Sequence, residues 1–449
     1  MSGTAKVLHY RAQFSGGRLA VRIGTQFQSR NIININVPGS KNWRSARFMS
    51  KGISAEIEKT EKAELHVHTS GSVTPEFLLK WGKDINWADP SYPDFAKLKY
   101  IEKKFSVSLT EIFRKDDLAS LKRIMESNGD KGEGLEGYLA RMDLGHRLLH
   151  NNLPAWRALA NDIAVNSYTK NNVTYLELRF PMIKPLLKPE EIVEAVYKGL
   201  FDAELECPGL KTAMIICTIK MFSMEQAQNI VDAMIALRKQ AKYRARLIGI
   251  DTAGPEVYRN PQGELEKFDH EKFKIPFALA RADGIKVVNH AGEQFLSLED
   301  GLEAIRNSVE VLGAVRIGHA LALGIDPGSL QDKTDGYGKY YGEDRIRALQ
   351  AAQEDLIKFL IERGVVIEAC LSSNTQTQPE MIPAIDSHPL GKWISKGLKV
   401  VLATDNLTTS HTDLTNEHLL AAGAFGLSMP QITKMISNGF ESKLKNNNI

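Results

Sequence analysis

The stretch Lys62-Ala63-Glu64-Leu65-His66-Val67-His68 combines a short apolar run with two histidines spaced two residues apart. Such a run favours a buried strand, and side chains two apart on a strand point the same way. Seven similar runs follow, each separated from the next by a longer segment with helical periodicity. The eight runs span residues 63–68, 173–180, 212–219, 247–252, 285–290, 315–319, 365–370 and 400–404.

Helix signals occupy the segments between these runs. Pro189 precedes two glutamates at an expected helix start, and Ser297 with Asp300 has the spacing of a capping box. Strands that alternate with helices predict an α/β protein with a parallel sheet, and eight near-equivalent units favour closure into a (β/α)8 TIM-type barrel. A doubly wound open sheet is the alternative.

The segment between the first two runs, residues 72–170, is too long for one crossover. It contains apolar helical stretches at 139–149 and 156–168, so we expect an inserted helical layer after strand 1. In a barrel this layer starts at the catalytic face, where it can form a lid.

The amino-terminal region is basic. Its first acidic residue is Glu56, which nine lysines and arginines precede. This composition is typical of an organellar transit peptide, and a poorly ordered extension or an upstream start site are the alternatives. We therefore expect a basic extension over residues 1–60 and the barrel over residues 61–440. The expected location is cytoplasmic, or mitochondrial if the leader is a transit peptide.

The overall composition points to a small-molecule partner. A net charge of +3 with 25% charged residues gives no reason to expect nucleic acid or a membrane surface. The cysteines Cys207, Cys217 and Cys370 form no CxxC pair and are interpreted as reduced core thiols. No apolar run approaches the roughly 18 residues of a membrane span. The oligomeric state is left open.

Polar residues suited to metal or proton chemistry follow several runs. Taken singly, each has a structural interpretation, such as a hydrogen-bonded core histidine or an aspartate that caps a turn. Taken together, they would meet in one pocket, because the carboxyl ends of barrel strands share one face. These residues are His66, His68, His290, Glu293, His319, Asp405 and Asn406.

Six motifs in one order resemble the signature of adenosine deaminases, and His388-Pro389-Leu390 also fits. The resemblance runs from about residue 61 to residue 418. The motifs are Lys62-Ala63-Glu64-Leu65-His66-Val67-His68, Gly249-Ile250-Asp251-Thr252-Ala253-Gly254-Pro255-Glu256, His290-Ala291-Gly292-Glu293, Arg316-Ile317-Gly318-His319, Cys370-Leu371-Ser372-Ser373-Asn374 and Thr404-Asp405-Asn406.

The resemblance implies one catalytic Zn2+ per chain, and imidazole and carboxylate ligands with an open position suit such a site. It implies hydrolytic deamination of adenosine and 2′-deoxyadenosine to inosine and 2′-deoxyinosine plus ammonia, by a zinc-activated water. The implied metal ligands are His66, His68, His290 and Asp405.

The resemblance also assigns roles around the substrate. A protonated Glu293 would give its proton to N1 of the purine, and His319 would orient the attacking water and help manage its proton. Asp405 would accept a hydrogen bond from that water. The implied substrate contacts are His68, Ser70, Gly254 and Asn406, with the Gly254 backbone close to the base. Arg316 is interpreted as a structural ion-pair residue, and Asn374 as a brace of the barrel mouth.

Two positions depart from the family pattern. Asn406 stands where many members have a second aspartate, and its amide would donate to N7 without titrating. Ser70 stands where an aspartate is common near the ribose 5′ end, and its neutral side chain could admit a phosphorylated or 5′-modified substrate.

These departures keep other functions open. The alternatives are a deaminase of AMP, N6-methyl-AMP or methylthioadenosine, and a non-catalytic nucleoside-binding paralogue. A binuclear amidohydrolase is disfavoured, because its fourth strand often ends in a modified lysine and this chain has Gly249-Ile250-Asp251-Thr252.

Overall fold

The computed structural model describes residues 13–15, 18–20, 51–126, 134–182, 187–260 and 262–444. One sheet contains eight parallel strands in the order β12-β11-β10-β9-β6-β5-β4-β3. Each predicted run overlaps one of them, so the parallel sheet is confirmed. The strands are β3 (Lys62–His68), β4 (Val173–Pro181), β5 (Lys211–Ile219), β6 (Leu247–Ala253), β9 (Lys286–Ala291), β10 (Ala314–His319), β11 (Val366–Ala369) and β12 (Lys399–Leu402).

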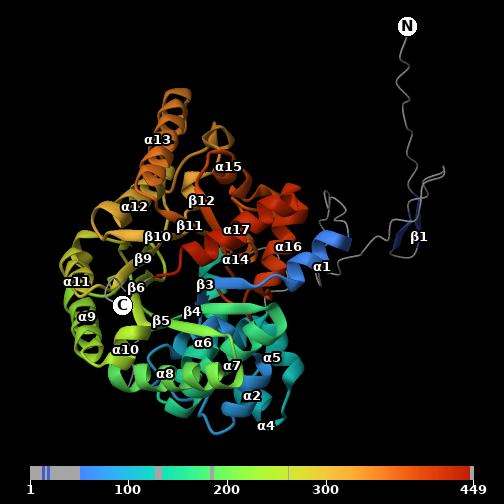
Figure 1. Cartoon of the computed structure of the whole chain (residues 1–449), viewed down its shortest axis with the longest axis vertical. Coiled ribbons are helices and arrows are strands. Elements are labelled where there is room, and N and C mark those ends of the chain that lie inside the picture. Colours follow the sequence, from blue (N-terminus) through green and yellow to red (C-terminus); the bar gives the residue numbers. More distant parts are fainter. Residues whose placement is uncertain are drawn as a thin grey trace.

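The sheet closes where β3 meets the residues that follow β12. Val67 and Asp405 form a parallel bridge. The Asp405 N–H donates to the His66 carbonyl, and the His68 N–H donates to the Asp405 carbonyl, both at 2.8 Å. This closure confirms the predicted TIM-type barrel and excludes the alternative, a doubly wound open sheet (Figure 1).

Helices surround the strands in the usual α/β arrangement (Figure 1). Ser297 and Asp300 form the predicted capping box, with each side chain accepting the other residue's N–H at 3.2 Å. The outer helices are α8 (Pro189–Glu206), α9 (Met224–Arg238), α10 (Ala241–Arg246), α11 (Glu271–Ala282), α12 (Leu298–Glu310), α13 (Glu343–Glu362), α15 (Leu390–Ser395), α16 (Leu414–Phe425) and α17 (Met429–Glu441).

The insertion after β3 is helical, as predicted. α6 packs closely on η1 (Ser70–Ser72), the turn that follows β3. A Cβ on Gly145 of α6 would lie 2.4 Å from the Ser70 carbonyl oxygen, so only glycine allows this approach. The insertion comprises α2 (Pro75–Trp81), α3 (Phe95–Phe105), α4 (Leu109–Arg114), α5 (Leu118–Met125), α6 (Gly134–Leu149) and α7 (Leu153–Asn171).

Charged residues fill the middle of the barrel. Arg179 pairs with Asp251 at 2.8 Å and with Glu368 at 2.6 Å. Arg316 pairs with Glu368 at 2.7 Å and with Glu177 at 2.5 Å, so it is the ion-pair residue that the sequence suggested. All five side chains are buried, and their mutual pairing offsets the cost of removing the charges from water.

The carboxyl-terminal segment covers the amino ends of the strands. Leu444 packs in an apolar cluster with Ile215, Ile248 and Val288. Its N–H donates to Glu177 at 2.8 Å, which links this cluster to the charged layer. The packed part of the chain therefore continues beyond the expected limit at residue 440.

The packed part also begins before the expected boundary at residue 61. α1 (Lys51–Lys59) contacts α16, and Ile57 is completely buried in the main core. α1 therefore shares the barrel's core, although it precedes residue 61. The transit-peptide interpretation concerns residues that lie mostly outside those described.

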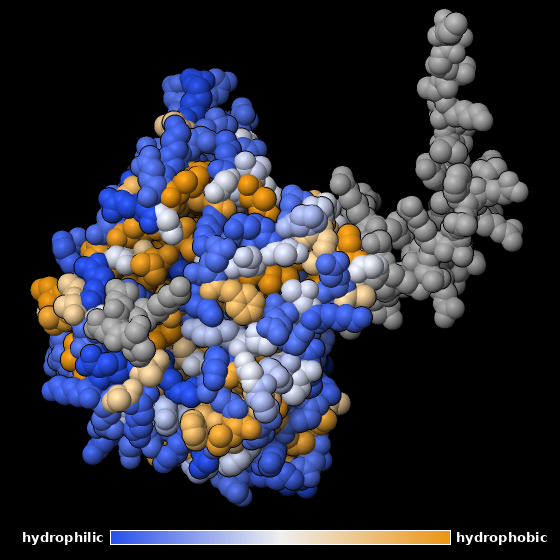
Figure 2. Space-filling view, viewed as in Figure 1, coloured by the Kyte–Doolittle hydropathy of each residue, from blue (hydrophilic) through white to orange (hydrophobic). Residues whose placement is uncertain are grey.

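The surface in the view of Figure 2 is mainly hydrophilic, with separate hydrophobic patches between charged regions. Within the described ranges, no helix has both the length and the hydropathy that crossing a bilayer requires.

Replacing Ile57 by alanine tests whether α1 belongs to the barrel. We expect a loss of about 2 to 5 kcal/mol in the free energy of unfolding, because the change empties a filled core position. Denaturant unfolding measures it, with Ile361→Ala on α13 as the control, since Ile361 is 43% exposed. Equal, small effects of the two changes would contradict this placement.

Candidate active site

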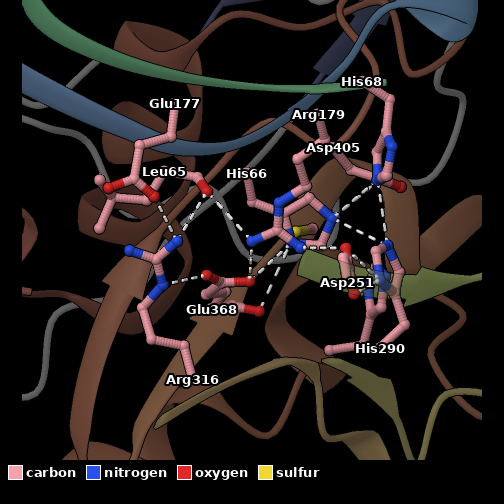
Figure 3. Close-up of polar contacts among 12 residues, drawn as sticks. Leu65, His66, His68, Glu177, Arg179, Asp251, His290, Arg316, Glu368 and Asp405 are labelled. Atoms are coloured by element: carbon pink, nitrogen blue, oxygen red, sulfur yellow. Dashed lines mark hydrogen bonds and ion pairs between the residues drawn. The ribbon is translucent and has the colours of Figure 1, made fainter. Parts of the chain in front are cut away.

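Three histidines converge at the carboxyl ends of the strands. His66 and His68 lie on β3 and His290 lies on β9. The His66 Nε2 atom is 3.1 Å from that of His68 and 3.0 Å from that of His290, and the last two are 3.0 Å apart. Asp405 Oδ1 is 3.4 Å from the Nε2 atoms of both His66 and His68. Figure 3 shows the nitrogen atoms turned toward one another.

Carboxylates behind two of the rings determine which nitrogen is free. His66 Nδ1 lies 2.9 Å from Glu368, and His290 Nδ1 lies 3.1 Å from Asp251 Oδ1. Each Nδ1–H donates to its carboxylate, so each Nε2 keeps a lone pair that points into the cluster. Behind His68, Nδ1 lies 4.0 Å from the Cys217 sulfur.

Burial keeps two of the rings uncharged. It lowers the pKa of His290 to about 3 and lowers that of His68 well below its ordinary value. Burial opposes ionisation of Asp405 too, but the adjacent imidazoles of His66, His319 and His68 hold its pKa well below the usual range. Ser373 donates to Asp405 Oδ2 at 2.6 Å, which leaves Oδ1 to face the histidines.

This arrangement fits a cation. Lone pairs on three nitrogens about 3 Å apart repel one another, and a positive ion between them removes the repulsion. Ligand atoms around a tetrahedral zinc ion lie about 3.4 Å apart, given bonds of about 2.0 to 2.1 Å. The predicted ligands His66, His68, His290 and Asp405 are therefore brought together in a set that can hold a metal. Asp251 also lies near, but its carboxylate serves His290 and Arg179.

Glu293 and His319 lie at the edge of this cluster. Glu293 Oε2 is 3.7 Å from His319 Nε2, and Oε1 accepts a hydrogen bond from Thr377 at 2.7 Å. The His319 ring centroid is 5.2 Å from that of His290. Both side chains are buried, so the predicted proton-handling pair lies next to the predicted metal ligands.

Strained backbone positions surround the cluster. His319 has φ 67° and Asp405 has φ 61°, in the left-handed region that side chains other than glycine rarely adopt. Gly254 has φ 92°, which only glycine adopts without strain. Such strain concentrates where function needs one particular orientation.

The two departures from the family pattern lie near one another, because a Cβ on Gly71, the residue after Ser70, would meet the Asn406 side chain. Ser70 is buried in the turn after β3. Asn406 Nδ2 donates to the Tyr138 hydroxyl at 3.0 Å, and Tyr138 is 2.6 Å from the Ser410 hydroxyl. One amide hydrogen of Asn406 is thus used by α6, which leaves the other for the expected contact with N7. The inserted layer therefore contacts the residue that follows Asp405 through Tyr138.

Several residues around the site were not assigned a role from the sequence. Glu256 accepts the N–H groups of Gly292 and Glu293 at 2.8 Å and that of Gln294 at 2.9 Å, so one carboxylate holds the turn that carries Glu293. The position of Glu256 in the Gly254-Pro255-Glu256 motif could have indicated this role from the sequence. For Glu368, Asp251 and Arg179, the sequence indication was a charged residue within an otherwise apolar strand.

Replacing Asp251 by asparagine tests whether the hydrogen bond between Asp251 and His290 Nδ1 contributes to metal binding. We expect zinc affinity to fall about 10- to 100-fold, because outer partners orient a metal-binding imidazole and raise its basicity. Competition with a chelator measures the zinc dissociation constant. Glu204→Gln is the control, since this carboxylate pairs with Arg246 away from the site. An unchanged constant in Asp251→Asn would contradict the arrangement.

Comparisons with known proteins identify the family of this chain. The adenosine deaminase family model matches residues 113–448. A curated relative is the adenosine deaminase of Shewanella halifaxensis, which is 29% identical over 392 residues, covering 85% of this chain and 94% of that protein.

Two solved structures share the fold. The apo N6-methyl-AMP deaminase of Arabidopsis thaliana has a TM-score of 0.59 at 18% identity, covering 88% of this chain and 95% of its own. An amidohydrolase from Burkholderia ambifaria, with bound Zn, has a TM-score of 0.61 at 18% identity and covers 92% of both chains. The model match spans most of the sequence and includes His290, Glu293, His319 and Asp405. The chain belongs to the adenosine deaminase family.

Proposed function

We propose that this protein hydrolyses adenosine and 2′-deoxyadenosine to inosine and 2′-deoxyinosine, with release of ammonia. The observation that carries the proposal is the convergence of three imidazole Nε2 atoms and one carboxylate beside a buried glutamate and a fourth imidazole. The names of the curated relatives support the choice of adenosine.

His66, His68, His290 and Asp405 would hold one Zn2+. When bound there, the ion would supply a water whose pKa is lowered to about 7, a nucleophile at neutral pH. Nitrogen and carboxylate ligands are those that catalytic zinc prefers, which supports zinc over a hard cation such as Mg2+.

Glu293 would act as the proton donor to the purine ring. Thr377 already donates to Oε1, so Oε2 is the oxygen left to carry the proton. Attack at C6 places electron density on the ring, and transfer of this proton to N1 would relieve it. Because Glu256 accepts N–H groups on both sides of Glu293, the carboxyl group is held in place before the substrate arrives.

His319 and Asp405 would handle the attacking water. The His319 Nε2 atom faces Glu293, so an oxygen bound between them meets both groups. Asp405 would accept a hydrogen bond from the water in addition to its role as a ligand. The water oxygen would form the new bond to C6 and pass its proton to Asp405, which accepts its hydrogen bond. The C6–N bond would then break, and the amino group would depart as ammonia carrying that same proton.

The remaining predicted contacts would orient the nucleoside. The Gly254 backbone would approach the base, since no side chain intervenes, and the free amide hydrogen of Asn406 would donate to N7. His68 would lie against the bound substrate, and Ser70 would face the ribose 5′ end.

Replacing Glu293 by glutamine tests the proton donor. We expect kcat for adenosine to fall about 10²- to 10⁴-fold while zinc content stays at one per chain, because the amide keeps the shape but carries no acidic proton. Loss of adenosine absorbance gives kcat, and metal analysis gives the zinc content. Glu303→Gln, at an exposed site on α12, is the control. Full activity of Glu293→Gln would favour the non-catalytic paralogue instead.

A second candidate substrate is a 5′-phosphorylated or 5′-modified nucleoside, such as AMP, N6-methyl-AMP or methylthioadenosine. Ser70 favours it, because no carboxylate stands at this buried turn to repel a phosphate. The Arabidopsis protein of the same fold is an N6-methyl-AMP deaminase.

Replacing Ser70 by aspartate separates the two substrate classes. If a phosphate binds beside residue 70, kcat/KM for AMP should fall at least about tenfold relative to that for adenosine, through repulsion between like charges. Ammonia release from both substrates measures the ratio, with Ser70→Asn as the neutral control. An unchanged ratio would exclude this position as the 5′ contact.

A further inference from the structure

The sequence motif His388-Pro389-Leu390 has no role in the chemistry described so far, yet it reaches the active site through hydrogen bonds. His388 Nε2 is 3.1 Å from Asn374 Oδ1, and Asn374 Nδ2 is 2.9 Å from His319 Nδ1. His388 precedes α15, whereas Asn374 lies in α14 (Leu371–Thr377). All three side chains are buried, so bulk water does not compete for these bonds.

The donor and acceptor in each of these hydrogen bonds follow from the contact at the end farthest from His319, between His388 and Leu390. The backbone N–H of Leu390 donates to His388 Nδ1 at 3.1 Å. A backbone N–H can only donate, so Nδ1 of His388 is the acceptor and its ring hydrogen resides on Nε2. That hydrogen is donated to the oxygen of Asn374, and the amide nitrogen is thereby turned toward His319.

His388 remains neutral, which keeps this direction. Burial lowers its pKa to about 3. The ring packs edge-on against Trp393, with 5.1 Å between the ring centroids, so it is held against rotation. Because His388 has a single ring hydrogen in a fixed position, it fixes the Asn374 amide in one orientation, with its oxygen toward His388 and its nitrogen toward His319.

We infer that His388 and Asn374 are positioning residues that fix the tautomer of His319, with the hydrogen on Nε2 and directed at the reacting oxygen. The amide N–H of Asn374 occupies the Nδ1 lone pair of His319, so the neutral ring carries its hydrogen on Nε2. His319 then enters the reaction as a hydrogen-bond donor to the attacking oxygen rather than as a base that receives its proton.

This inference rests on the proposed function for the identity of the reacting oxygen, but the tautomer itself does not depend on it. A purely structural brace would need only packing, whereas here every donor meets an acceptor in one consistent direction from Leu390 to His319. The partner that fixes the tautomer of a catalytic histidine can contribute up to about 10⁴-fold in rate.

Nitrogen NMR of the zinc-loaded full chain, labelled with 15N-histidine, reads the tautomer directly. His319→Gln identifies the His319 signals by their disappearance. We expect the shift of a protonated Nε2 and an unprotonated Nδ1 in the unmodified protein. A protonated Nδ1 with an unprotonated Nε2 would overturn the inference, whether or not the protein deaminates adenosine.

Two substitutions at position 388 test the consequence for the reaction. His388→Met removes the donor, and His388→Gln retains an N–H that can reach Asn374. We expect kcat to fall about tenfold or more in His388→Met, with KM within about twofold, and to recover substantially in His388→Gln. The thermal midpoint of each variant shows whether it is folded.

Equal kcat values for the folded unmodified, Met and Gln proteins would overturn the role, as would equal losses in both variants. If His388→Met does not fold, the spectrum of the unmodified protein decides the question. Absence of deamination by the unmodified zinc-loaded protein would reject the proposed function, while the tautomer would still be tested by the spectrum.

Discussion

The bridge between Val67 and Asp405 closes the barrel at the site itself. The Asp405 backbone bonds to His66 on one side and to His68 on the other, so closure of the sheet and gathering of the ligands are a single event. The left-handed backbone of Asp405 costs about 1 to 3 kcal/mol, which the two hydrogen bonds help to offset. If this edge were open, the carboxylate at 405 would have no fixed position relative to the histidines.

The charged layer inside the barrel serves both packing and chemistry. Glu368 binds two arginines and the Nδ1 atom of His66, while Asp251 binds Arg179 and the Nδ1 atom of His290. Burial opposes ionisation of Glu368, but the arginines hold its pKa below the ordinary value. The same ion pairs that fill the interior therefore keep the carboxylates charged and the imidazoles oriented with Nε2 toward the metal position.

The sequence predicted the barrel strands and the convergence of His66, His68, His290 and Asp405, because strand periodicity and position at a strand end are local properties. It did not reveal the hydrogen bond between Asn406 and Tyr138, or the hydrogen bonds that link His388 to His319 through Asn374. Those contacts depend on where the inserted helices and the later loops pack. The packing of α1 on the barrel was not anticipated either, since α1 lacks a strong local signal and is recognised by the burial of Ile57.

The proposed chemistry requires one cation that three histidines and one aspartate share. Anomalous X-ray scattering from crystals of the zinc-loaded protein, recorded on both sides of the zinc absorption edge, locates this cation. We expect one zinc peak per chain, about 2.0 to 2.2 Å from the Nε2 atoms of His66, His68 and His290 and from an oxygen of Asp405. A second peak in the barrel mouth, or zinc bound only at other residues, would contradict it.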